Sequence, residues 1–256
     1  MTLSKELILI KLKATAIHLS LSILVFAVLS YLILYHWYPQ PYFSIDGGWQ
    51  GMRIIAVVDL VLGPLITLLI FDNRKSRREI ITDLGIILVI QLGALAYGIH
   101  AAYSQRPAAI VILDNFVMPV TASEYGDSLK SLEELRQYSP ESPPIIYSRV
   151  PDEASSGNSL QDKMVDLEGQ VKNRALVEYY RPAEEIAPAL RIRQERLRKR
   201  LKQQELEPAF GEWLESNGQS ADSVLIEMFA GRYGTAWLVF DNAGDYLGYF
   251  LGLSYE

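Results

Sequence analysis

Residues 14–35 read ATAIHLSLSILVFAVLSYLILY, an apolar run of 22 residues without Asp, Glu, Lys or Arg. A helix of that length extends about 33 Å, which is enough to cross the hydrocarbon core of a bilayer. Two further apolar runs follow at residues 54–71 and 84–103, and Asp59 is their one charged residue. Three such runs within the first 106 residues leave too little polar chain to wrap them as core helices, so we expect three transmembrane helices.

The charges divide the chain into two unlike parts. Residues 1–106 hold nine Lys and Arg against six Asp and Glu, for +3, and residues 107–256 hold 15 against 24, for −9. We therefore expect a three-span region at 1–106, with the lipid bilayer as its partner, and a soluble domain at 107–256. The net charge of −6 argues against nucleic acid as a partner, and the absence of Cys excludes disulfides and Cys nucleophiles.

Basic residues predict the orientation of the spans. Seven Lys and Arg lie before the first span or in the connection at 72–83, against Arg53 alone in the connection between the first two spans. Because cytoplasmic flanks are enriched in Lys and Arg, we expect the N-terminus and the loop at 72–83 in the cytoplasm and residues 107–256 outside, in the periplasm of a two-membrane bacterium. A cleaved signal peptide is the alternative for the first run, but no small-x-small site follows it, so we interpret it as a retained anchor. At the outer end of the first two spans we expect aromatic side chains in the headgroup zone, namely Tyr35, Trp37, Tyr38, Tyr42, Phe43 and Trp49.

Two features of the spans are candidate partner contacts. A carboxylate inside an apolar helix costs about 3 kcal/mol on insertion scales, and Asp59 lies four residues before Gly63-Pro64, where proline bends the helix. Asp59 is thus either a recognition or proton-handling site, or a residue near the outer interface that reaches water or pairs with Arg53 and fixes helix packing. In the third span Ala94, Gly98 and Ala102 form a small-xxx-small row that lets another helix approach, from this chain by preference or from a partner.

The soluble part predicts a small α+β domain. Residues 109–114 and 145–150 are typical of strands, and helices are expected after Asp127-Ser128, up to about Val177, from Pro182 to about Leu206 and around Trp213. Residues 235–240 and 246–251, separated by Asp241-Asn242-Ala243-Gly244-Asp245, predict a C-terminal β-hairpin. We expect this hairpin and the strand near residue 110 to share one small antiparallel sheet, with helices over one face.

Residues 191–202 hold seven cations in an otherwise acidic part of the chain. One interpretation is a contact for anionic lipid or an acidic partner through Arg193, Arg196 and Arg200. The other is an ordinary solvated helix face, with Leu190, Leu197 and Leu201 turned inward. Motifs of the common catalytic sites are absent from the sequence, and the three His lie in or beside separate spans without chelating spacing. We expect no enzyme, cofactor, metal or small-molecule substrate.

The order of these parts resembles the TfpX/TfpZ family of type IV pilin accessory proteins. The resemblance covers the first 107 residues and is looser beyond them, at Tyr179-Tyr180-Arg181-Pro182 and the closing hairpin. Its motifs are the basic start Lys11-Leu12-Lys13-Ala14, Trp37-Tyr38-Pro39, Val58-Asp59-Leu60-Val61-Leu62-Gly63-Pro64-Leu65, Gln91-Leu92-Gly93-Ala94-Leu95-Ala96-Tyr97-Gly98 and Arg106-Pro107.

This resemblance implies a multi-pass protein of the bacterial inner membrane that binds or stabilises a cognate major type IV pilin and supports pilus assembly, in a chaperone-like role. We expect the spans to hold the apolar helix of the pilin and the acidic domain to contact its head. The alternative is a membrane sensor or ligand-binding protein that acts through a partner. The residues expected to contact the partner are Asp59, Gly63, Pro64, Ala94, Gly98, Arg193, Arg196 and Arg200.

Overall fold

The computed structural model describes residues 5–70, 75–113, 116–126, 129, 131–149 and 177–255. Its internal contacts divide the chain into two units. We call Met1–Pro39 with Gly48–Tyr103 the helical unit, and Gln40–Gly47 with Ser104–Glu256 the sheet unit. The expected helix start at Asp127-Ser128 and the end of the strand at Asp114 lie outside the described residues, as does nearly all of the helical stretch expected to end near Val177.

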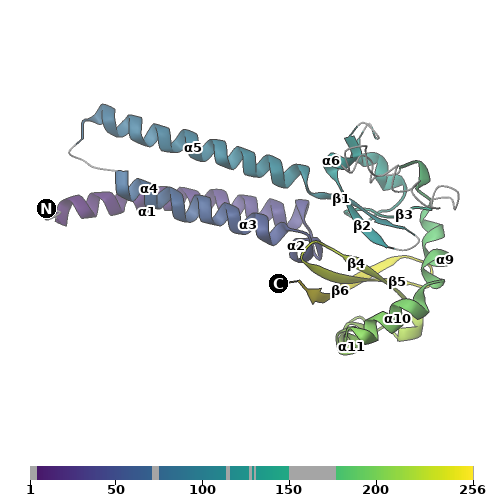
Figure 1. Ribbon diagram of the computed structural model, residues 1–256. Helices are drawn as coiled ribbons and strands as arrows, with labels where there is room; N and C mark the ends of the chain where they lie inside the picture. Colours follow the sequence, from purple (N-terminus) through teal and green to yellow (C-terminus); the bar gives the residue numbers. More distant parts are fainter. Residues whose placement is uncertain are drawn as a thin grey trace. The chain divides into compact units, whose positions relative to one another are not determined.

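Within the described residues, the helical unit has three helices that are long and apolar enough to cross a membrane, as expected. Large apolar side chains are exposed on all three, among them Leu24, Val61 and Val89, as on a surface that faces lipid. Figure 1 shows the first and second of these helices side by side. The first is α1 (Lys5–Leu32) with the π-helical turn η1 (Ile33–Trp37); the second is α3 (Gly48–Ala56), the π-helical η2 (Val57–Leu62) and α4 (Gly63–Ile70); the third is α5 (Arg77–Ser104).

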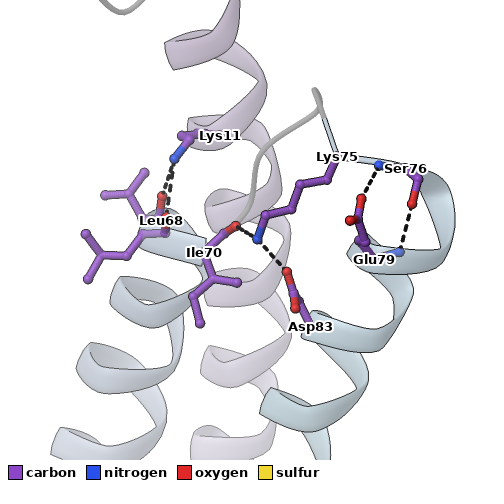
Figure 2. A network of polar contacts seen from close by, with 8 residues as sticks. Lys11, Leu68, Ile70, Lys75, Ser76, Glu79 and Asp83 are labelled. Atoms are coloured by element: carbon purple, nitrogen blue, oxygen red, sulfur yellow. Dashed lines mark hydrogen bonds and ion pairs between the residues drawn. The ribbon is translucent and has the colours of Figure 1, made fainter. Parts of the chain in front are cut away.

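Each helix extends beyond the apolar run that predicted it, and the loop expected at 72–83 is accordingly shorter. Helix α5 already begins at Arg77 because the two residues around its start form a capping box. The Ser76 backbone N–H donates to Glu79 Oε2 at 2.7 Å, and the Glu79 N–H donates to Ser76 Oγ at 3.3 Å (Figure 2). These reciprocal hydrogen bonds satisfy backbone donors that the first helical turn leaves free.

Lysines lie at one end of the helical unit and aromatic residues at the other. Lys11 Nζ donates to the Leu68 carbonyl at 3.4 Å, and Lys75 Nζ donates to the Ile70 carbonyl at 3.2 Å (Figure 2). The last carbonyls of α4 have no intrahelical donor, so both ammonium groups are well placed there. At the opposite ends of α1 and α5, aromatic rings meet edge to face, with the centroids of Trp37 and Tyr103 5.5 Å apart.

The sheet unit contains two three-stranded sheets in its described part (Figure 1). In the first, β1 (Pro107–Ile112) pairs antiparallel with β2 (Val117–Thr121) and parallel with β3 (Ile145–Tyr147). In the second, β4 (Val224–Ala230), β5 (Gly234–Asp241) and β6 (Tyr246–Ser254) are antiparallel. In the described residues after Ser104, the helices of four or more residues are α6 (Ala122–Tyr125), the 3₁₀ helix η4 (Leu132–Gln137), α9 (Ile186–Arg191), α10 (Gln194–Gln203) and α11 (Glu207–Ser216).

The C-terminal hairpin is confirmed, since β5 and β6 pair with Trp237 opposite Phe250. The single sheet expected to join this hairpin to the strand near residue 110 is wrong. Strand β1 is buried on both faces: Ile110 and Ile112 pack towards the second sheet with Phe229, while Ala109 and Val111 belong to another core cluster. A strand buried on both faces lies between layers, and here it is stacked on the hairpin sheet rather than hydrogen-bonded to it.

The segment between the first two helices belongs to the sheet unit, although its sequence position predicts a loop near the headgroups. Within it, α2 (Tyr42–Ile45) contributes Tyr42 and Ile45 to the core that the two sheets share. The Tyr42 ring meets Phe229 edge to face at 5.7 Å, and Tyr233 N–H donates to the Ile45 carbonyl at 2.9 Å. Tyr42 and Phe43 are therefore buried in protein, because the second sheet offers apolar surface that a headgroup zone does not.

Candidate functional site: a polar cluster among the apolar helices

Polar side chains from all three helices meet inside the helical unit. His18 of α1 lies with Nδ1 2.6 Å from Oγ1 of Thr67 on α4. The Thr67 hydroxyl donates to the Gly63 carbonyl at 3.1 Å, which leaves its oxygen free to accept from the His18 ring. Thr67 is only 2% exposed, so this pair links α1 to α4 in a place that water does not reach.

Gly63 allows the third helix to join this cluster. A Cβ at this position would lie 1.9 Å from Nε2 of Gln91 on α5 and 3.2 Å from Nε2 of His18. Any side chain there would have to displace the Gln91 amide, so the absence of a Cβ leaves room for the Gln91 side chain of α5 beside α4. Pro64 follows and is buried with it. The Gly63-Pro64 motif therefore lies where the Gln91 side chain reaches α4.

Asp59 lies in the same part of the unit, within the π-helical turn η2. Its side chain is buried, at 6% exposed, and its Oδ2 accepts no hydrogen bond from any described residue. It lines a cavity of about 90 Å³ together with His18, Ser22 and Gln91. Among the described residues no ion pair joins Asp59 to Arg53, which is exposed, so the interpretation of Asp59 as an interfacial residue paired with Arg53 is not what the structure shows.

An apolar cleft of about 380 Å³ adjoins this cavity. It is bordered by α1, α4 and α5, and it shares His18, Leu21, Leu88 and Gln91 with the cavity of Asp59. A second cleft of about 240 Å³ lies on the other side of α5, against α4, and Gln91 borders it as well. Helix α5 thus leaves apolar clefts on both sides, with polar groups at their inner ends.

The small residues of α5 are not used as expected. A Cβ at Gly98 would meet nothing within 4 Å, and Ala94 is exposed. The row Ala94, Gly98 and Ala102 therefore does not hold one of the chain's own helices closely at Gly98, because close packing of helices would fill the space around that position. Contact of this row with a partner stays a prediction.

Arg193 has an internal role instead of the surface role predicted for it. Its side chain is 6% exposed, with one guanidinium nitrogen donating to the Leu113 carbonyl at 2.7 Å and another 2.7 Å from Oε2 of Glu227. It thereby links the end of β1 to β4, and its charge is not presented to a partner. Arg196 and Arg200 are exposed on α10, whose Leu197 and Leu201 are buried as expected.

His18, Thr67 and Gln91 were not predicted as site residues. Each is a polar residue within an apolar run, which is the one signal that the sequence carries for them. Their convergence depends on the rotation of three helices about their axes, which no local pattern specifies. Within the described ranges, no group of three or more His, Asp or Glu could hold a metal ion. The cluster offers hydrogen-bond donors, acceptors and one carboxylate.

Comparisons with known proteins find relatives described as fimbrial assembly proteins. A sequence profile described as fimbrial assembly protein FimB matches residues 7–47. The fimbrial assembly protein of serogroups C1 and C2 of Dichelobacter nodosus is 38% identical over 109 residues, which cover 43% of this chain and 83% of that protein. Those of serogroups I and E1 of the same organism are 37% and 36% identical over 140 residues, 54% of this chain and 52% of theirs.

The chain thus spans about half the length of the serogroup I and E1 relatives. No solved structure matches it. The relative of which it covers 83% is, like the matched profile, described as a fimbrial assembly protein. The chain therefore belongs to the fimbrial assembly protein FimB family.

Proposed function

We propose that this protein is a non-enzymatic accessory protein of the bacterial inner membrane that binds or stabilises a cognate major type IV pilin and supports pilus assembly, as its resemblance to TfpX/TfpZ proteins implies. One observation carries the proposal: the cleft of about 380 Å³ among α1, α4 and α5, apolar along its walls and ending at polar groups. A subunit that waits in the membrane before assembly exposes an apolar helix, and such a cleft offers that helix a protein surface. The names of the relatives, which refer to fimbrial assembly, support the same biology.

The proposed orientation has the N-terminus in the cytoplasm and the sheet unit in the periplasm. Lys11 and Lys75 lie at the same end of the helical unit, and cytoplasmic flanks are enriched in such residues. The sheet unit combines residues 40–47 with residues 104–256, and one folded unit of sheets cannot be divided by a bilayer. One span lies between the N-terminus and residues 40–47, and three lie between the N-terminus and residues 104–256. In the proposed orientation both segments are therefore on the periplasmic side, opposite to the N-terminus.

The experiment that tests the proposal uses the natural absence of Cys. Leu88→Cys places a thiol in the cleft, and Val89→Cys places one on the next residue, which is 71% exposed and does not line the cleft. In membranes of cells that make the cognate pilin, with single Cys residues along the apolar helix of the pilin, oxidation is expected to crosslink Leu88→Cys and not Val89→Cys.

Equal crosslinking at both positions would indicate that the two proteins collide at random in the bilayer and make no specific contact in the cleft. Failure of both variants, together with failure of the tagged wild-type protein to recover any pilus component, would contradict the proposal. Such a result would leave the sensor or ligand-binding alternative, in which a small apolar molecule occupies the cleft.

A further inference from the structure

One carboxylate oxygen of Asp59 lacks a hydrogen-bond donor among the described residues. This atom, Oδ2, is buried and accepts no hydrogen bond from the described residues, although Ser22, His18 and Gln91 line the same cavity. An unsatisfied buried acceptor is costly, and it is costlier where no water can replace the missing donor.

The local charge is also unbalanced. Asp59 is the one Asp or Glu between Arg53 and Phe71, and Lys11 and Lys75 bind carbonyl groups at the end of α4. Among the described residues, no Lys or Arg forms an ion pair with Asp59. His18 is the basic side chain that lines the same cavity, but Oδ2 accepts no hydrogen bond from it, so a cationic group from a partner would supply both a donor and a positive charge to this oxygen.

The route to Asp59 passes along the apolar cleft. The cavity of Asp59 and the cleft of about 380 Å³ share four lining residues, so a helix lying in the cleft brings its side chains next to the carboxylate. The cleft itself is lined by apolar side chains except at His18, Thr67 and Gln91. A ligand that fits both parts is apolar along its length and carries one cation at the level of Asp59.

From this complementarity we infer that Asp59 is a recognition site for an ammonium or guanidinium group carried by a partner's apolar transmembrane helix. This inference rests on the proposed function, because it gives the chemistry of the partner that the cleft would hold. It assigns Asp59 a role in binding at a cost in the stability of the free protein.

The two roles of Asp59 make opposite predictions for Asp59→Asn. In the recognition role, Asn removes an uncompensated buried charge, so the detergent-solubilised protein should unfold at a higher temperature while it recovers less pilin, by about tenfold, from crosslinked membranes. Asp59→Glu keeps the charge and should recover within about threefold of the wild-type amount. In a purely structural role, Asp59→Asn would instead lower the unfolding temperature.

The matched control is Asp83→Asn, the same change at the start of α5, where Asp83 pairs with Lys75 at 2.6 Å. Pilin recovery should be unchanged in this variant. If the wild-type protein and Asp59→Asn recover pilin equally well, the inference is overturned but the proposed function stands. That result would point to a neutral donor on the partner or to a protonated Asp59. Wild-type protein that recovers no pilin would contradict the proposed function itself.

Discussion

Gly63 leaves room for the Gln91 side chain of α5 beside α4. A methyl group there would overlap Nε2 of Gln91 and displace that flexible side chain, so Gly63→Ala should destabilise the helical unit by about 1 kcal/mol, at the low end of the cost of overpacking. Thermal unfolding in detergent measures this effect. Gly93→Ala is the control on α5, because a Cβ there meets nothing within 4 Å. Adding Gln91→Ala to Gly63→Ala should restore stability, and a double variant as unstable as the single one would show that another clash is responsible.

The Arg193–Glu227 pair is a residue-scale link between the two sheets. Both side chains are almost fully buried and 2.7 Å apart, so Arg193→Met leaves a buried carboxylate without its partner and should cost about 3–5 kcal/mol. Removing both charges, with Arg193→Met and Glu227→Met together, should cost much less. Chemical denaturation of the two variants measures the difference. If the double variant were as unstable as the single one, packing of the side chains rather than charge would explain the loss.

The same pair gives stability a dependence on pH. Burial raises the pKa of Glu227 above its ordinary value of 4.5, against the lowering effects of Arg193, the Met228 N–H and Arg196. The folded state then holds this proton more tightly than the unfolded chain, so the free energy of unfolding should fall as the pH rises from 4.5 through the folded-state pKa. Denaturation of the wild type and of Glu227→Gln across this range isolates the effect, since the Gln variant should lack it.

At the scale of elements, helix α10 closes one edge of the second sheet. The Gln194 side chain donates to the Ile226 carbonyl at 2.8 Å and accepts from the Ile226 N–H at 3.0 Å, so its amide replaces a neighbouring strand. Gln194→Ala should therefore cost about 2 kcal/mol and promote aggregation through β4. Gln203→Ala, at an exposed position of the same helix, is the control for lost helix surface. Chemical denaturation measures the loss of stability, and light scattering measures aggregation. Equal effects of Gln194→Ala and Gln203→Ala would show that Gln194 makes only a surface contact and does not cap the edge of the sheet.

The extent of the helices could be predicted at this scale only in part. Apolar runs predicted the three long helices because length and hydropathy are local properties. They did not predict the π-helical turn around Asp59 or the start of α5 at Arg77, which depend on packing beside Gly63-Pro64 and on the Ser76–Glu79 capping box. The polar residues that flank each apolar run carry no hydropathy signal, so hydropathy does not show that the helices continue through them.

At the scale of the whole molecule, the sheet unit is made from two separate parts of the chain. Residues 40–47 enter it from between the first two helices, and Tyr42 and Ile45 fill its shared core. Residues 104–256 expressed alone should therefore fold poorly, since losing these two side chains creates a cavity and uncovers Phe229. Limited proteolysis of this fragment and of the full protein measures the difference. Equal protease resistance would show that α2 is dispensable.

The sequence by itself determined the features that arise within a short stretch of chain. The apolar helices follow from hydropathy, and the hairpin follows from the turn at Asp241–Asp245 between two aromatic runs. Family membership adds the biology of fimbrial assembly to these local features.

Tertiary structure alone decided the features that join distant residues. The meeting of His18 with Thr67, the burial of Arg193 between two sheets and the inclusion of residues 40–47 in the sheet unit each depend on how separate elements are rotated and stacked. A periodic pattern specifies which side of a helix or strand is apolar, but it does not specify which other element covers that side. For that reason the sequence predicted Asp59 as a candidate, whereas its unfilled acceptor and its neighbours appeared only when the three helices were packed together.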